Sequence, residues 1–537
     1  MKKTALALGL LVSLFGALNI IAEARTNQEV TPFAEVSLTA PIQIDSGPIR
    51  GRVDGKLHAF LGIPYAAPPV GELRWMPPTP PMSWQVERLA TTYGHSCPQN
   101  ADLGVFGKPG GAEDCLSLNV FVSPDALAEK GKLPVLVWIH GGSLWVGSGQ
   151  DYDPQKLVVE GKAVLVTLNY RLGLLGYFAS PALKAEGHAV GNFGLMDQQF
   201  AFDWVQRNIA AFGDDPENVT IAGESSGGNS VMAHVLSPQS AGKFRQAISM
   251  SGASLILRHP TFGAPRPLAA AEQVGQDFAK AVGCEATDMH CLRNLPLATV
   301  LAQQSPYLIN QVIIDGETIP MHPADAFTTG QFNRVPVING VTRDEGDFFA
   351  ALVEHTAKAP LNKSSYQDLM RVYFGAHTEK ALEAYSLAHY NTPSDAAAAA
   401  IGDMLLACPA HKLNQWLSQY TPTYGFEFAD RTAPSYVAPT SFALGAAHTF
   451  ELPYLFEGFH GGEGHPVQLN ALQEKLSSEM VRFWTSASML DQIKPTWTPY
   501  DPAQQNYMTF VLPSAEMKAQ RFAQDHHCEF WDNIGIY

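Results

Sequence analysis

One serine lies in a sequence context suited to nucleophilic chemistry. Ser225 is the central residue of the pentad Gly223-Glu224-Ser225-Ser226-Gly227, which directly follows the apolar run 219–222 (VTIA). The residues after the pentad can begin a helix, so the serine would occupy a sharp turn between a strand and a helix. A side chain at position 223 or 227, two residues from Ser225, would collide with neighbouring backbone in such a turn, which explains why both positions are glycine. We predict that Ser225 is a nucleophile; an ordinary Gly/Ser turn is the alternative.

A glycine-rich stretch could stabilise the charge that such an attack creates. His140-Gly141-Gly142-Ser143 ends the apolar run 134–139 (PVLVWI), one strand and loop before the pentad. The backbone N–H groups of Gly142, Ser143 and Ser226 are candidate donors to a carbonyl oxygen that becomes negative during acyl transfer. Taken alone the stretch is equally a glycine-rich loop. Its position upstream of Ser225 favours an oxyanion hole.

A serine hydroxyl also needs a base, and the base needs a carboxylate to orient it. Asp344 and Glu345 both follow a strand candidate at 335–341, and the residues leave open which of them serves. His448 ends a loop of small residues, 444–448, before the apolar run 452–456, and is the candidate base. The order nucleophile, acid, histidine along the chain is the order found in folds with this kind of serine turn.

These motifs follow apolar runs that would be buried strands. The runs 134–139, 163–170 and 219–222 predict strands, and 195–212 carries apolar residues at helical spacing. Strands alternating with helices indicate a mostly parallel sheet, whose active sites lie at the carboxyl ends of the strands. No repeat or long charge run divides the chain. We predict one domain with insertions.

The first residues have the pattern of a signal peptide. Met1-Lys2-Lys3 precedes an apolar run, 5–21, and the small-x-small triplet 22–24. A membrane anchor is the alternative, but the run is at the lower length limit for a span and no stop-transfer flank follows. We predict a signal peptide at 1–24 and an exported single domain at 25–537, periplasmic or secreted, with no membrane span in the mature protein. The net charge of −16 makes nucleic acid a poor partner.

Six cysteines in an exported chain can form three disulfides, for which 15 pairings exist. Local spacing favours Cys97 with Cys115 and Cys284 with Cys291, which leaves Cys408 with Cys528. A metal site would need Cys-x-x-Cys or His/Cys pairs at the spacing of metal ligands. In the sequence only His526-His527-Cys528 comes close to such a pattern. We expect no metal and no cofactor.

Further motifs extend along nearly the whole chain after residue 24. They are 60–66 (FLGIPYA), 68–71 (PPVG), 113–119 (EDCLSLN), 169–171 (NYR), 191–198 (GNFGLMDQ), 212–216 (FGDDP) and 223–228 (GESSGG). With these motifs the chain resembles the type B carboxylesterases, the family that includes acetylcholinesterase and bacterial para-nitrobenzyl esterase. The resemblance implies an α/β-hydrolase fold, with a central, mostly parallel sheet flanked by helices and large insertions around the active-site gorge.

The resemblance also assigns roles. It implies Ser225 as nucleophile, Glu345 as acid and His448 as base, with Gly142, Ser143 and Ser226 as oxyanion donors. It implies the same three disulfides that spacing favours. The expected reaction is the hydrolysis of small-molecule carboxylic esters through an acyl-enzyme, without a cofactor.

The chain departs from the family pattern in several places. Ser226, Ser143 and Asp214 replace smaller residues, and the loop 98–114 holds no Trp, where cholinesterases place an aromatic face for a quaternary ammonium. A true cholinesterase is therefore not expected. The alternatives are an amide or carbamate hydrolase that uses the same triad, and a non-catalytic binding protein of the same fold, as in neuroligins. The natural ester and the oligomeric state are not predicted.

Overall fold

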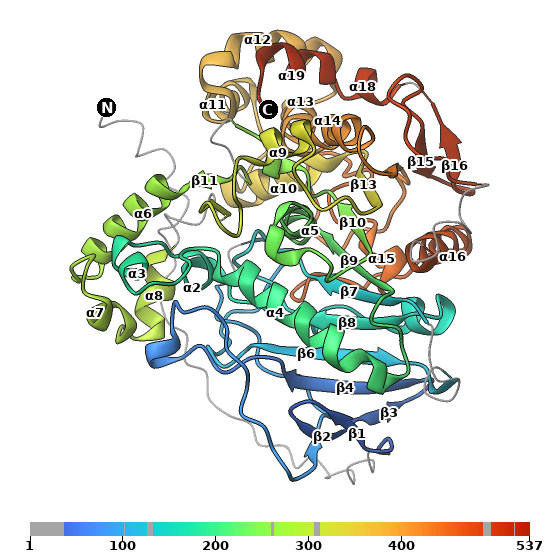
Figure 1. The fold of residues 1–537 in the computed structure, drawn as a ribbon. Coiled ribbons are helices and arrows are strands. Elements are labelled where there is room, and N and C mark those ends of the chain that lie inside the picture. Colours follow the sequence, from blue (N-terminus) through green and yellow to red (C-terminus); the bar gives the residue numbers. More distant parts are fainter. Residues whose placement is uncertain are drawn as a thin grey trace, which may run out of the picture.

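A large mixed sheet forms the centre of the molecule (Figure 1). The computed structural model describes residues 37–100, 103–125, 133–258, 263–304, 312–486, 496–519 and 521–537. In these residues the sheet has the strand order β16-β15-β14-β13-β10-β9-β7-β8-β6-β4-β3. The predicted signal peptide, residues 1–24, lies outside the described ranges.

The middle strands of this sheet are parallel and the strands at its two ends are antiparallel. The parallel strands are β7 (Val135–Ile139), β8 (Val164–Leu168), β9 (Val219–Glu224), β10 (Gln246–Met250), β13 (Val337–Thr342), β14 (Thr423–Phe428) and β15 (Tyr507–Phe510). The antiparallel ones are β3 (Arg52–Asp54), β4 (Leu57–Pro64), β6 (Ser117–Val122) and β16 (Glu516–Lys518). Two small sheets join β1 (Ile42–Ile44), β2 (Gly47–Arg50) and β5 (Arg88–Leu89), and β11 (Arg266–Pro267) with β12 (Ile313–Ile314).

The parallel strands are continuous apolar runs because helices cover both faces of the sheet. In β7, Val135 and Val137 belong to one hydrophobic core, whereas Leu136 and Trp138 belong to the other. The first core includes side chains of α4 (Phe193–Asn208) and α5 (Ser226–Leu236), and the second those of α15 (Leu452–Leu455) and α16 (Ala471–Ser486). Alternate side chains of each strand therefore pack against different layers of helices.

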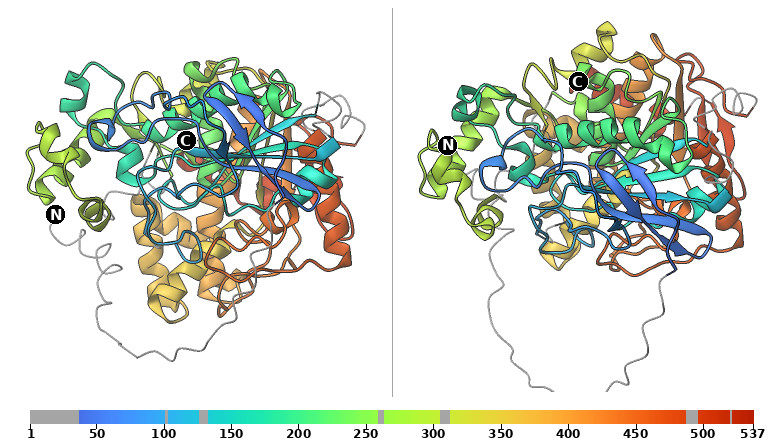
Figure 2. Two further views of the ribbon diagram at one scale, coloured as in Figure 1. Left: turned by 90° about the horizontal axis from the view of Figure 1, so that it is seen from below. Right: turned by 60° about the horizontal axis from the view of Figure 1, so that its bottom comes forward.

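Two further groups of helices extend from this sandwich. One group has a core of its own around Trp75, Phe178 and Phe278, and both views of Figure 2 show its α6–α8 part at the side of the molecule. It comprises α2 (Gly173–Tyr177), α3 (Pro181–Ala185), α6 (Leu268–Ala281), α7 (Met289–Arg293) and α8 (Leu297–Gln304). The other comprises α9 (Pro323–Thr329), α10 (Glu345–Ala357), α11 (Lys363–Phe374), α12 (Thr378–Ala384), α13 (Pro393–Gly402), the π-helix η10 (Asp403–Ala407), α14 (Cys408–Leu417), α18 (Phe522–Asp525) and α19 (Cys528–Ile534).

The predicted elements match the structure, with shifts at their ends. The strands expected at 134–139, 163–170, 219–222 and 335–341 are β7, β8, β9 and β13, and the mostly parallel sheet flanked by helices is confirmed. The helix expected at 195–212 is α4, followed by a 3₁₀ turn. The helical spacing of its apolar residues describes α4 only in part, because α4 also buries polar residues. One of them, Asp197, pairs with Arg171 at 2.7 Å.

Three disulfides join Cys97 with Cys115, Cys284 with Cys291 and Cys408 with Cys528. These are the pairings that both the spacing and the resemblance favoured. In the ranges that the structure describes, no helix has the length and apolar character needed to cross a bilayer.

Candidate active site

Ser225 lies in the turn between β9 and α5, at the carboxyl end of the sheet's middle strands. Its φ of 59° and ψ of −124° are strained values for a residue with a side chain. A Cβ on Gly223 would lie 2.7 Å from the carbonyl oxygen of Ile139, and one on Gly227 would collide with the same oxygen. The two glycines therefore allow the turn to pack directly against the end of β7.

The stretch His140-Gly141-Gly142-Ser143 begins where β7 ends, beside the Ser225 turn. Its conformation is held by backbone contacts: Trp145 and Val146 both donate to the Gly142 carbonyl, and Leu144 donates to the Ser226 hydroxyl at 3.1 Å. In the described part of the chain, no acceptor is bonded to the backbone N–H of Gly142, Ser143 or Ser226. These three predicted donors are available to a bound oxyanion.

Glu345 and His448 are brought together where the chain after β13 pairs with the loop 444–448, through a bridge between Asp344 and Ala447. Glu345 follows β13 and begins α10, and its Oε2 lies 2.6 Å from Nδ1 of His448. Its other oxygen accepts hydrogen bonds from Ser251 at 2.5 Å and from the Thr342 backbone at 2.8 Å. The carboxylate is thus fixed at both oxygens, which sets the orientation of the imidazole.

Asp344, the alternative that the sequence left open, has a different position. It accepts a hydrogen bond from the Ala446 backbone N–H at 2.9 Å and pairs with Arg431. The Asp344 N–H donates in turn to the Ala446 carbonyl. Asp344 therefore holds the backbone of the loop that carries His448, while Glu345 contacts the ring.

Two buried carboxyl groups beside His448 were not singled out by the sequence. Oε1 of Glu224 lies 3.3 Å from Nε2 of His448, and Glu451 is fully buried three residues after it. Burial raises the pKa of both groups well above the usual range, and the proximity of Glu345 raises them further. Both shifts favour the neutral acid, which reduces the negative charge that His448 faces.

Two small cavities meet at Ser225 and His448. One, of about 40 Å³, is lined by Ser143, Leu144, Ser225, Ser226, Asn229, Ser251, Ser254, Gly263, Val312, Phe349, Leu405, Leu406 and His448. The other, of about 20 Å³, is more aromatic and is lined by Leu103, Phe106, Gly141, Gly142, Ser143, Tyr152, Glu224, Ser225, Phe348, Phe349, His448 and Thr449. A substrate carbonyl at Ser225 would place its two substituents in different surroundings.

The structure thus brings every predicted site residue to one place. In the described residues no hydrogen bond joins Ser225 to His448, a separation that is common before substrate binds. Sequence reasoning missed Ser251, Glu224 and Glu451, and also Phe106, which gives the loop 98–114 an aromatic ring at the site. A carboxylate directly before the nucleophile at the end of a buried strand was the signal available for Glu224. No cluster of three or more His, Cys, Asp or Glu suited to a metal occurs among the described residues.

Comparison with known proteins gives one consistent result. The family model "Carboxylesterase family" matches residues 39–531. The chain is 32% identical to an acylcarnitine hydrolase of Mus musculus, over 91% of each chain. It is 31% identical to a cocaine esterase of Homo sapiens, over 88% of this chain and 87% of that protein. A solved thermophilic PNB esterase superposes with a TM-score of 0.76 at 28% identity, covering 91% of this chain and 99% of that chain.

Proposed function

Because the chain belongs to the carboxylesterase family and is a carboxylic ester hydrolase, we propose that it cleaves esters through an acyl-enzyme formed on Ser225. His448 acts as base and Glu345 as its carboxylate partner. Gly142, Ser143 and Ser226 supply the oxyanion donors. The observation that carries the proposal is the contact of 2.6 Å between Glu345 and His448, at the cavities that contain Ser225.

The first half-reaction forms the acyl-enzyme. With Nδ1–H donating a hydrogen bond to the Glu345 carboxylate, Nε2 of His448 is the unprotonated nitrogen and takes the proton of the Ser225 hydroxyl. Oγ of Ser225 bonds to the ester carbonyl carbon, and the carbonyl oxygen becomes an anion that the three backbone N–H groups hold. The carbonyl re-forms, the bond to the alkoxy group breaks, and His448 passes its proton to the leaving alcohol.

The second half-reaction releases the acid. His448 takes a proton from a water molecule, whose oxygen attacks the acyl carbon, and the tetrahedral anion again forms at the same donors. Collapse breaks the bond to Oγ of Ser225, which regains the proton from His448. Glu345 stabilises the imidazolium that exists during each half-reaction.

Replacement of the nucleophile tests this assignment. Ser225→Ala should lower kcat on short-chain p-nitrophenyl esters by at least about 10⁴-fold and abolish labelling by an organophosphate. Ser230→Ala is a matched control, because this buried serine lies on α5 and accepts a hydrogen bond from Gln198 at 3.3 Å. A Ser225→Ala protein that kept wild-type rates and was still labelled would refute the assignment.

We also propose that residues 1–24 direct export and are removed. Three disulfides support this proposal, because such bonds persist mainly in oxidising compartments such as the periplasm or the extracellular space. N-terminal sequencing of protein recovered from the periplasm or medium should begin at Arg25. Recovery of the full-length chain from the cytoplasm alone would contradict the proposal.

A further inference from the structure

One wall of the 40 Å³ cavity is formed by the π-helix η10. Leu405 and Leu406 line the cavity that holds Ser225 and His448. Asp403 and Ala407, the first and last residues of η10, line a second cavity of about 440 Å³ on its other side. Leu405 and Leu406 also belong to the large hydrophobic core, and η10 is continuous with α13 before it and α14 after it. The contacts at its two ends help to set the position of this wall.

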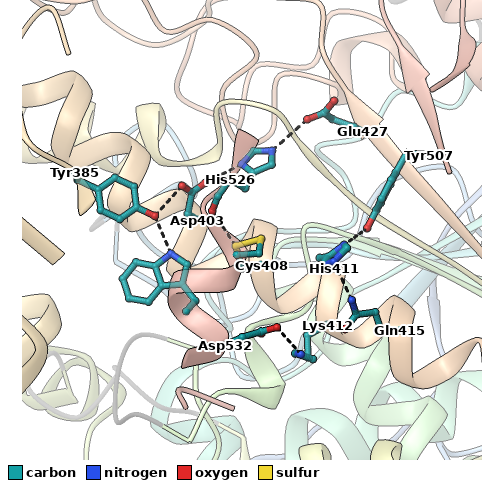
Figure 3. Close-up of a disulfide and its surroundings, with 12 residues drawn as sticks. Tyr385, Asp403, Cys408, His411, Lys412, Gln415, Glu427, Tyr507, His526 and Asp532 are labelled. Carbon is teal, nitrogen blue, oxygen red and sulfur yellow. Dashed lines mark hydrogen bonds and ion pairs between the residues drawn. A yellow bond between two sulfur atoms is a disulfide. The ribbon is translucent and has the colours of Figure 1, made fainter. Parts of the chain in front are cut away.

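The amino end of η10 is held by a buried charge cluster (Figure 3). Asp403 accepts a hydrogen bond from Nδ1 of His526 at 2.7 Å, and Nε2 of His526 lies 3.2 Å from Glu427 on β14. All three residues are at most 7% exposed. Although burial alone would lower it, the hydrogen bonds to the two carboxylates raise the pKa of His526 to about 10. His526 is therefore a buried cation that bridges two carboxyl groups.

Further polar groups complete this cluster. The second oxygen of Asp403 accepts a hydrogen bond from Tyr385 at 2.9 Å, and Tyr385 accepts one from Trp531 at 2.8 Å. Arg343 lies 3.3 Å from Glu427 on the opposite side. Each carboxylate thus has a partner besides His526, so the cluster is a connected network and not an isolated pair.

The carboxyl end of η10 is held by the same part of the chain. Cys408 directly follows the π-helix, and its backbone N–H donates to the Asp403 carbonyl. Its disulfide partner, Cys528, is two residues after His526, and the Cys408 sulfur lies 3.0 Å from the His526 carbonyl oxygen. Figure 3 shows these contacts side by side. Residues 526–528 therefore clamp both ends of a single π-helical turn, a form that is rare and occurs mostly within α-helices, as here between α13 and α14.

We propose that His526 is a positioning residue for substrate selectivity: by holding Asp403, it fixes the place of Leu405 and Leu406 and so the size of the ester group that the cavity accepts. The inference rests on the proposed roles of Ser225 and His448, because it concerns the cavity beside them. His526 itself touches no substrate. Loss of His526 should change the selectivity between esters more than it changes the rate at which a small ester is cleaved.

The test compares selectivity in the full-length mature protein and its variants. One series of p-nitrophenyl esters varies the acyl group from acetate to hexanoate and pivalate, and a second series of acetate esters varies the alcohol. In His526→Gln, the ratio of kcat/KM between the bulkiest and smallest member of one series should shift by about tenfold, mainly through KM. kcat on p-nitrophenyl acetate should stay within about threefold. If the ratio shifts in the first series, the cavity holds the acyl group; if it shifts in the second, the cavity holds the alcohol group.

Two further variants make the result specific. Lys412→Ala removes an ion pair of 2.7 Å with Asp532, which ties the same C-terminal segment to α14 away from η10, and should leave both ratios unchanged. Glu427→Gln keeps an acceptor for His526 and removes one charge, so it should shift the same ratio by a smaller factor even if His526→Gln does not fold. Unchanged ratios in the folded variants, or an equal fall for every ester, would overturn the inference. Activity in Ser225→Ala would instead overturn the proposed function.

Discussion

The two halves of the proposed site are held in place by different interactions. The nucleophile half, comprising the Ser225 turn and residues 140–143, is fixed by close contacts between backbone segments at Gly223 and Gly227. The histidine half is fixed by buried side chains, since Glu345 binds Ser251, the Thr342 backbone and His448. A backbone contact tolerates almost no added atom, whereas a side-chain network tolerates changes of shape but not of charge or hydrogen-bonding pattern. The two halves should respond to different substitutions.

Among the substitutions that compare the two halves, the largest effect is expected where hydrogen bonding is altered without a change of shape. Glu345→Gln retains the size of the side chain but no longer favours the tautomer with the proton on Nδ1 of His448. We expect kcat to fall by about 10³- to 10⁴-fold. Asp344→Asn is the matched control, because Asp344 contacts the loop backbone and not the ring; its effect should be below about tenfold. Equal losses in the two variants would mean that the carboxylates share the role.

In the nucleophile half, the addition of a single methyl group should be enough to lower catalytic activity. Gly227→Ala places a Cβ against the carbonyl oxygens of Ile139 and His140 and displaces the adjacent Ser226 N–H. We expect kcat to fall by about 100-fold, as when one oxyanion donor is lost. Gly55→Ala, in the open turn between β3 and β4, should lose only about 1–2 kcal/mol of stability and keep its rates. Normal turnover by Gly227→Ala would show that the close packing of the turn is dispensable.

One buried carboxyl group before the amino end of β9, the strand that Ser225 follows, provides a pH-dependent test. Asp214, just before β9, is 4% exposed, and burial raises its pKa to about 8. Since the unfolded chain releases this proton near pH 4, the folded state binds more protons between about pH 4 and 8, and stability falls as pH rises through that range. Asp214→Asn should remove this fall. The unfolding free energy of Asp214→Asn, relative to that of the wild-type protein, should increase by up to ~1.4 kcal/mol per pH unit between pH 5 and 8.

Urea unfolding at several pH values measures this gain, and Asp215→Asn at the partly exposed neighbouring position is the control. A gain for Asp214→Asn that is the same at pH 5 and pH 8 would contradict the assignment.

The smallest effect is expected at the outer edge of the histidine half. The Arg431 side chain is 62% exposed, and its pair with Asp344 is therefore screened by water. Arg431→Ala should cost less than about 1 kcal/mol of stability and change kcat/KM by no more than about threefold. Thermal unfolding and p-nitrophenyl acetate kinetics measure both. A loss comparable with that of Glu345→Gln would mean that the Arg431–Asp344 pair is needed to hold His448.

The same difference between the halves explains how far the sequence could be interpreted. Gly223, Gly227 and the run 140–143 are local signals, because a turn that must pass close to other backbone needs glycine at fixed positions. The burial of successive strand residues likewise appears as apolar runs, and the sheet was predicted from them. Selecting Glu345 over Asp344 required the family resemblance, because adjacent carboxylates at a strand end differ only in where the backbone directs them.

Other parts of the site have no local signature. Ser251 reaches Glu345 across 94 residues, and His526 reaches Asp403 across 123. Nothing near His526 in the sequence identifies its partners, and the pair His526-His527 before Cys528 was considered only as a weak metal motif. Phe106 illustrates the same limit, since a loop judged by its lack of Trp still places an aromatic ring beside Ser225. Contacts of this kind depend on the assembled fold.

The position of His526 and Cys528 also has a consequence for biogenesis. Every proposed catalytic side chain lies at or before residue 448, yet the residues that clamp η10 follow the last strand of the main sheet, β16. Under the proposed export, a chain made from its amino end contains every proposed catalytic side chain before the segment that shapes one wall of the cavity has emerged. Selectivity is therefore completed last, after the final segment has docked and the Cys408–Cys528 bond has closed.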